Sequence, residues 1–91
     1  MPAPEESKLR EQLEAEGFSH TFVWWDRPGK SYPNHTHAGT TAHIILDGEL
    51  TLTFGAQTRT CHAGDRCDIP AGKVHSARIG PQGCRYLIGE K

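Results

Sequence analysis

The stretch from Gly29 to Gly48 reads GKSYPNHTHAGTTAHIILDG and holds three of the six histidines of the chain. His35 and His37 are two residues apart in a run, 31–37, that we interpret as a β-strand. Period two then places both imidazoles on one face. Two imidazoles on one face are an arrangement typical of metal ligands, although the pair is also common in strands that bind nothing.

His43 follows this pair after a turn signal at 38–39. If that turn is the tip of a hairpin, His43 pairs with His35 and Thr41 pairs with His37. Residues directly opposite each other share a face, so all four side chains would then point the same way. A shift of one residue would turn His43 away from the pair.

The chain beyond residue 18 consists of short apolar or alternating runs separated by turn residues, with ten Gly and six Pro in the whole sequence. Many short strands with regular turn signals predict an all-β sandwich or barrel. The expected strands are 20–26, 31–37, 41–46, 49–54, 57–62, 66–69, 74–79 and 84–88.

A single helix is expected before these strands, over residues 4–16. Pro4 suits its first turn, Leu9 and Leu13 form a narrow apolar stripe, and Gly17 is a natural stop. We therefore divide the chain into an N-terminal helical segment, 1–17, and a barrel domain, 18–91.

The spacing of these residues resembles that of the cupin superfamily. Its first motif is Gly, five residues, His-x-His, three or four residues, Glu, six residues, Gly. Four positions of this chain match the motif: Gly29, His35, His37 and Gly48. Thr41 stands where the Glu belongs. The second motif is Gly, five residues, Pro-x-Gly, two residues, His, three residues, Asn. Four positions match this second motif: Gly64, Pro70, Gly72 and His75. Ile79 replaces the Asn.

The resemblance covers residues 20–88 and implies a small antiparallel jelly-roll barrel. It implies that His35, His37 and His75 point inward around one divalent transition metal, for which imidazoles favour Fe, Ni, Zn or Co. Thr41 leaves three alternatives open. The site has three histidines, or His43 adds a fourth nitrogen, or the metal is lost and the barrel remains as a ligand pocket.

The resemblance implies three possible functions for this chain. The first is a metal-dependent enzyme, such as a dioxygenase, isomerase or lyase acting on a small molecule. The second is a non-catalytic metal-binding or small-ligand-binding module, for example a sensor domain. The third is a structural protein whose metal only holds the fold together. Fold alone does not decide among them.

Composition restricts the partners. A chain of 91 residues has room for one core, and so small a core favours a homodimer. A formal net charge of −1 argues against nucleic acid as a partner. No apolar run is long enough to cross a membrane and no signal-peptide pattern is present, so we expect a cytoplasmic protein.

The cysteines predict reduced thiols. Cys61, Cys67 and Cys84 are odd in number and form no CxxC pair. We therefore expect no disulfide framework, and each residue buried as a small hydrophobic side chain.

Overall fold

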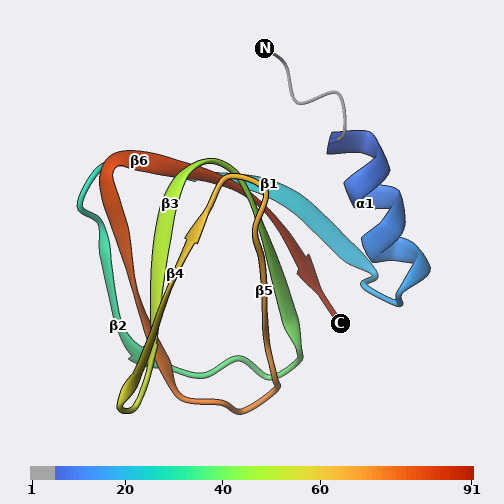
Figure 1. Cartoon of the computed structure of the whole chain (residues 1–91). Coiled ribbons are helices and arrows are strands. Elements are labelled where there is room, and N and C mark those ends of the chain that lie inside the picture. The colour runs from blue at the N-terminus through green and yellow to red at the C-terminus, as the bar shows by residue number, and fades with distance from the viewer. Residues whose placement is uncertain (1–5) are drawn as a thin grey trace.

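The computed structural model describes residues 6–91, as one helix and six strands. The elements are α1 (Glu6–Ala15), β1 (His20–Asp26), β2 (Ser31–His35), β3 (Thr41–Phe54), β4 (Gln57–His62), β5 (Arg66–Ile69) and β6 (His75–Glu90). All strand pairs are antiparallel. The predicted all-β jelly-roll barrel with a short N-terminal helix is confirmed, and Figure 1 shows the strands wrapped around a common interior.

β3 and β6 form the spine of the barrel. They pair with each other over most of their length, from Thr41↔Glu90 to Thr53↔Ser76. β1 and β2 both pair with the other edge of β6, while β4 and β5 both pair with the other edge of β3. Each long strand therefore pairs with two short strands along its outer edge, and the sheet bends near the middle of β3 and β6.

The predicted breaks at 47–48 and at 80–83 are bends within continuous strands, not turns between separate ones. Gly48 has a φ of +83°, and a Cβ placed on it would overlap the carbonyl oxygen of Gly83, which lies beside it on β6. The β3–β6 register shifts on both sides of this contact. Glycine is needed here because the two backbones approach closely where the sheet bends.

The predicted hairpin between β2 and β3 is wrong. β6 separates the two strands, and His35 pairs with His75 of β6 instead of His43. Residues 36–40 cross between the edges of the barrel, where the Gly72 N–H donates to the His37 carbonyl (2.9 Å) and the Lys91 N–H donates to the Thr40 carbonyl (3.0 Å). Gly39 is needed because a side chain there would overlap the Lys91 carbonyl oxygen.

The helix prediction is confirmed for the part of the chain that the structure describes, while Pro4 and Glu5 lie outside it. Gly17 has a φ of +101°, and the Phe18 N–H donates to the Leu13 carbonyl (3.0 Å), which ends the helix as a Schellman motif. Leu13 and Phe18 are buried against Ala42, Ile44 and Leu87 of the sheet. This small core attaches α1 to the outside of the barrel.

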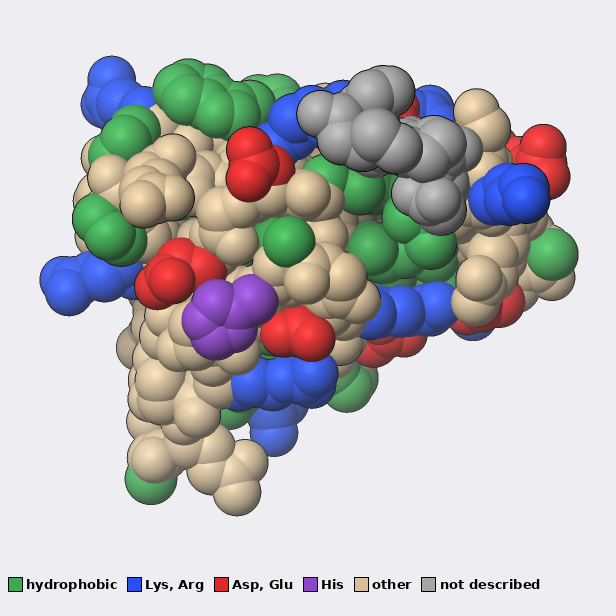
Figure 2. Space-filling view, turned by 45° about the horizontal axis from the view of Figure 1, so that its top comes forward, with side chains coloured by type: hydrophobic (Ala, Val, Ile, Leu, Met, Phe, Trp, Pro, Cys, Tyr) green, Lys and Arg blue, Asp and Glu red, His purple; other side chains and the backbone are tan. Residues whose placement is uncertain are grey.

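Two arginines of the barrel also hold α1 in place, through ion pairs with acidic residues at or next to its ends. Arg66 of β5 donates to both carboxylate oxygens of Glu16, and Arg85 of β6 donates to Glu6 at 2.8 Å. On the face drawn in Figure 2, acidic and basic side chains are interspersed over the surface. None of the helices among residues 6–91 is long and apolar enough to span a membrane.

Candidate metal centre

Three histidines meet at one end of the barrel interior. His35 ends β2, His75 begins β6, and the two are directly paired across the strands. His37 lies two residues beyond His35, in the crossing segment. Their donor nitrogens all lie within 4.8 Å of one another, which makes them a group that could hold a metal ion. His20 and His62 are exposed on the surface and do not belong to this group.

Backbone carbonyls select the tautomer of two of these rings. His35 Nδ1 lies 2.7 Å from the Pro33 carbonyl, and His75 Nδ1 lies 2.9 Å from the Lys73 carbonyl. A carbonyl only accepts, so each Nδ1 carries the proton and donates it. In a neutral imidazole, Nε2 is then left with a free lone pair. A histidine that donates its other ring N–H to a backbone carbonyl is the usual arrangement of a metal-ligating histidine.

His37 is kept neutral by its surroundings. Burial lowers the pKa of His37 below its ordinary value, and the neighbouring His75 and His35 lower it further because a second positive charge there would be repelled. Metal binding requires unprotonated imidazole, so these surroundings favour the form that can ligate. The residues present therefore fit a divalent transition metal.

His43 lies in the same interior but outside the group of three. It is two residues into β3, opposite Cys67 of β5, and its ring centroid is 5.9 Å from that of Tyr86. Its Nδ1 is buried with no hydrogen-bond partner among the residues described. Burial lowers the pKa of His43 to about 4, and the backbone of Cys67 offsets part of that effect.

Thr41 occupies the position of the missing Glu. Its side chain is buried, and Oγ1 has no hydrogen-bond partner within the described chain. It pairs with Ile69, which lines the interior cavity, so Thr41 and His43 share the inward face of β3. The predicted face is thus confirmed for both residues, although the hairpin that was expected to produce it does not exist.

The histidines open onto a cavity of about 290 Å³ inside the barrel. Its wall is mainly apolar and aromatic, and His43 lies in it together with the group of three. The other lining residues are Phe22, Trp24, Tyr32, Leu50, Leu52, Ile69, Ala77, Tyr86 and Ile88. A concave apolar site with a few convergent polar groups is the usual form of a small-molecule site.

Asp26, which the sequence analysis did not single out, organises one side of this cavity. The carboxylate is 6% exposed at the end of β1. Oδ1 accepts from the Trp24 indole N–H (3.1 Å) and the Tyr32 hydroxyl (2.7 Å), and Oδ2 accepts from the Tyr86 hydroxyl (2.7 Å). The sequence signal that could have identified Asp26 is its spacing from Trp24. The two residues are two apart in one strand, so their side chains lie on the same face.

The two tyrosines are held in their protonated form. Burial raises the pKa of Tyr86 far above its ordinary value, and the hydrogen bond to Asp26 raises it further. The same two causes raise the pKa of Tyr32. Both hydroxyls therefore keep their protons and donate them to the carboxylate.

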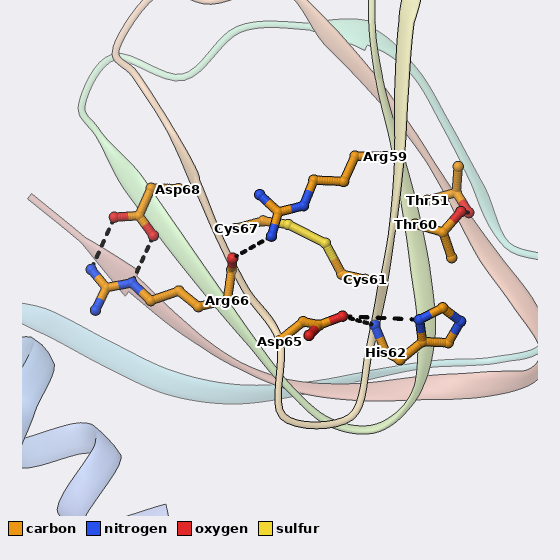
Figure 3. The surroundings of a disulfide bond; sticks show 9 residues. All are labelled: Thr51, Arg59, Thr60, Cys61, His62, Asp65, Arg66, Cys67 and Asp68. Carbon is orange, nitrogen blue, oxygen red and sulfur yellow. Dashed lines mark hydrogen bonds and ion pairs between the residues drawn. A yellow bond between two sulfur atoms is a disulfide. The ribbon is translucent and has the colours of Figure 1, made fainter.

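The cysteine prediction is wrong for two of the three residues. Cys61 of β4 and Cys67 of β5 are buried as expected but are joined in a disulfide (Figure 3). Cys84 is a buried free thiol. The two strands run along the same edge of β3, and a tight turn connects them. That turn is held to β3 by the Ile45 backbone, which bonds Gly64 and Asp65 at 2.9 Å each. An odd count and the lack of CxxC could not show this proximity.

Comparison with known proteins agrees with the motif spacing. The sequence model of the Cupin domain family matches residues 22–88, which is most of the chain. This chain is a cupin. Among curated proteins, a quercetin 2,3-dioxygenase of Bacillus subtilis is 40% identical over 52 residues, and that match spans 56% of the chain but only 15% of the dioxygenase.

Solved structures with the same fold include two of comparable identity. A cupin-2 domain protein of Shewanella frigidimarina is 25% identical with a TM-score of 0.68, over 77% of this cupin and 67% of that chain. The DMSP lyase DddQ of Ruegeria pomeroyi is 26% identical with a TM-score of 0.71, over 78% of this cupin and 36% of the lyase. The named relatives therefore include a dioxygenase and a lyase.

Proposed function

We propose that this cupin binds one divalent transition metal through His35, His37 and His75 and holds a small organic molecule against it, as a metal-dependent enzyme. The observation that carries the proposal is the pair of fixed tautomers. The carbonyls of Pro33 and Lys73 accept hydrogen bonds from the Nδ1–H groups of two histidines, so that in the neutral rings both Nε2 lone pairs are free, beside a third imidazole whose neutral form is favoured. Imidazole ligands of this kind favour Fe, Ni, Zn or Co.

The residues around the metal supply the rest of the site. A bound metal would act as a Lewis acid toward an oxygen of the ligand. The apolar wall excludes water and packs against the body of the ligand. In this proposal His43 is part of that wall and a neutral hydrogen-bonding group, because its donors lie outside the group of three.

Oxygenation is the reaction class to test first. The support is the 40% identity to part of a quercetin 2,3-dioxygenase, together with a donor set of three histidines without the motif carboxylate. The chain spans only a small fraction of that dioxygenase, so the substrate of the dioxygenase is not carried over to this cupin.

The experiment is cobalt substitution followed by addition of azide. An enzyme site needs a coordination position that solvent or substrate can occupy. We expect the visible spectrum of the cobalt protein to change when azide binds. A spectrum that azide leaves unchanged would favour the alternative function, a metal-binding module whose site is closed by protein ligands. Oxygen uptake by the iron-loaded protein, screened against small hydroxylated aromatics, then tests the reaction class.

We also propose a homodimer in which β1 meets its copy. β1 pairs only with β6 among the described strands, and it carries Trp25, which is 59% exposed. An unpaired edge strand with an exposed aromatic side chain is a surface that proteins usually cover. Light scattering of the purified protein tests this, with Trp25→Glu expected to yield monomer.

A further inference from the structure

The geometry points to a polarity filter in the cavity. We propose that Asp26 is a positioning residue that makes Tyr32 and Tyr86 act as hydrogen-bond acceptors toward the ligand. Beside these tyrosines, the cavity then selects a ligand that presents a hydroxyl group over one that presents a carboxylate. This inference rests on the proposed function, because it takes the cavity beside the three histidines as the ligand site.

The first step concerns the protons of the tyrosines. The Trp24 indole N–H can only donate, so Asp26 is an acceptor toward it. An ionised carboxylate accepts only, and three converging donors satisfy it. The two O–H···O distances of 2.7 Å are as short as charge-assisted hydrogen bonds usually are. Both tyrosine protons are therefore directed at Asp26.

The second step concerns what these tyrosines can still offer. A phenol whose proton is donated elsewhere keeps only oxygen lone pairs for further contacts. Tyr32 and Tyr86 both line the cavity. A ligand that forms a hydrogen bond to either oxygen must therefore supply the donor. A ligand hydroxyl can donate in this way, whereas a carboxylate cannot.

The third step concerns charge. The described residues that line the cavity include neither Lys nor Arg. The Lys30 ammonium lies 5.3 Å from the centroid of the Tyr32 ring, but Lys30 does not line the cavity. When the metal is occupied by the head of the ligand, a carboxylate at its other end would be repelled by Asp26 and would find no Lys or Arg in the wall.

The test compares three catechols that share a metal-binding head and differ at one ring position. These are 3,4-dihydroxybenzyl alcohol, 4-methylcatechol and 3,4-dihydroxybenzoate. Titration calorimetry of each into the zinc-loaded protein, without oxygen, gives three Kd values whose ratios do not depend on how much of a variant is folded. Trp25→Phe is the control, since Trp25 neighbours the network on the exposed face of β1.

In the unaltered protein we expect the alcohol to bind about five- to tenfold more tightly than the methyl compound. The carboxylate should bind at least about tenfold more weakly than the methyl compound. Asp26→Asn releases a tyrosine proton toward the ligand, so both ratios should fall to within about threefold. Tyr86→Phe removes one of the two acceptors and should reduce the preference for the alcohol, whereas Trp25→Phe should preserve both ratios.

Two failures are distinguishable. If all three catechols bind with ratios that Asp26→Asn and Tyr86→Phe leave unchanged, the polarity filter is wrong and the proposed function stands. If the protein takes up zinc but binds none of the catechols, the cavity is not the ligand site and the proposed function falls with the filter. Should Asp26→Asn fail to fold, Tyr86→Phe alone decides, because it keeps the carboxylate and removes only one acceptor.

Discussion

His43 should make the metal-free protein sensitive to mild acid. Burial lowers the pKa of His43 to about 4, whereas an unfolded histidine titrates near its ordinary value of 6.5. As the pH falls below about 6.5, the unfolded chain binds a proton that the folded chain refuses. The contribution of His43 to stability is thus fully present above that pH and is lost progressively down to the folded-state pKa.

The size of the effect follows from the two pKa values. Each unit of difference corresponds to about 1.36 kcal/mol, so at pH ~4.5 the loss of unfolding free energy amounts to about 2–3 kcal/mol. For a domain of this size, urea reduces the unfolding free energy by about 1 kcal/mol per molar. The midpoint of urea unfolding should therefore fall by about 2–3 M because of His43 alone.

The assay is urea unfolding of chelator-treated protein at pH ~7.5 and ~4.5, for the unaltered chain, for His43→Leu and for His62→Ala as an exposed control. His43→Leu removes the titrating group and its unpaired buried Nδ1, so it should be close to neutral at the higher pH. At the lower pH it should be more stable than the unaltered protein by about 2–3 kcal/mol. Equal acid sensitivity of the unaltered protein and His43→Leu would refute the reasoning, because the titrating group would then lie elsewhere.

Two further predictions concern the scaffold. Gly48→Ala combines a left-handed φ with an overlap onto β6, so it should destabilise the protein by about 3 kcal/mol or more in urea unfolding. At Gly64 φ is also positive, but an added Cβ would have no atom within 4 Å, so Gly64→Ala should lower the unfolding free energy by only about 1–2 kcal/mol. Equal losses in the two variants would contradict the close approach of β3 and β6 at Gly48. Alkylation of unfolded, unreduced protein should modify Cys84 alone, because Cys61 and Cys67 are joined. Three modified cysteines by mass spectrometry would show that the pair is reduced.

The pattern of short strands and turns, together with the motif spacing, predicted the architecture and the three clustered histidines. Glycine and proline mark the places where a closed sheet must bend, and such positions are visible in a sequence. Gly48 illustrates both the strength and the limit of this signal. It was identified as a break, and it is a bend within β3, since a glycine at a barrel corner and a glycine in a turn look alike without knowledge of the neighbouring strand.

Pairings between distant segments could not be predicted in the same way. His35 pairs with His75, which is forty residues away, and a local hairpin between β2 and β3 was the simpler expectation. Asp26 gathers donors from β1, β2 and β6, and the disulfide joins strands that lie along one edge of β3. These features depend on which edges of β3 and β6 are occupied, and that information is not local.

The most direct test of the account is the metal content of protein prepared without an affinity tag, measured by elemental analysis after incubation with Fe, Ni, Zn or Co and removal of excess metal. We expect about one metal ion per chain in the unaltered protein and in His62→Ala. His35→Ala, His37→Ala and His75→Ala should each lose most of it while keeping the β-rich circular dichroism spectrum. An unaltered protein that retains none of the four metals, or three histidine variants that retain as much metal as His62→Ala, would contradict the claim that these imidazoles form a metal centre.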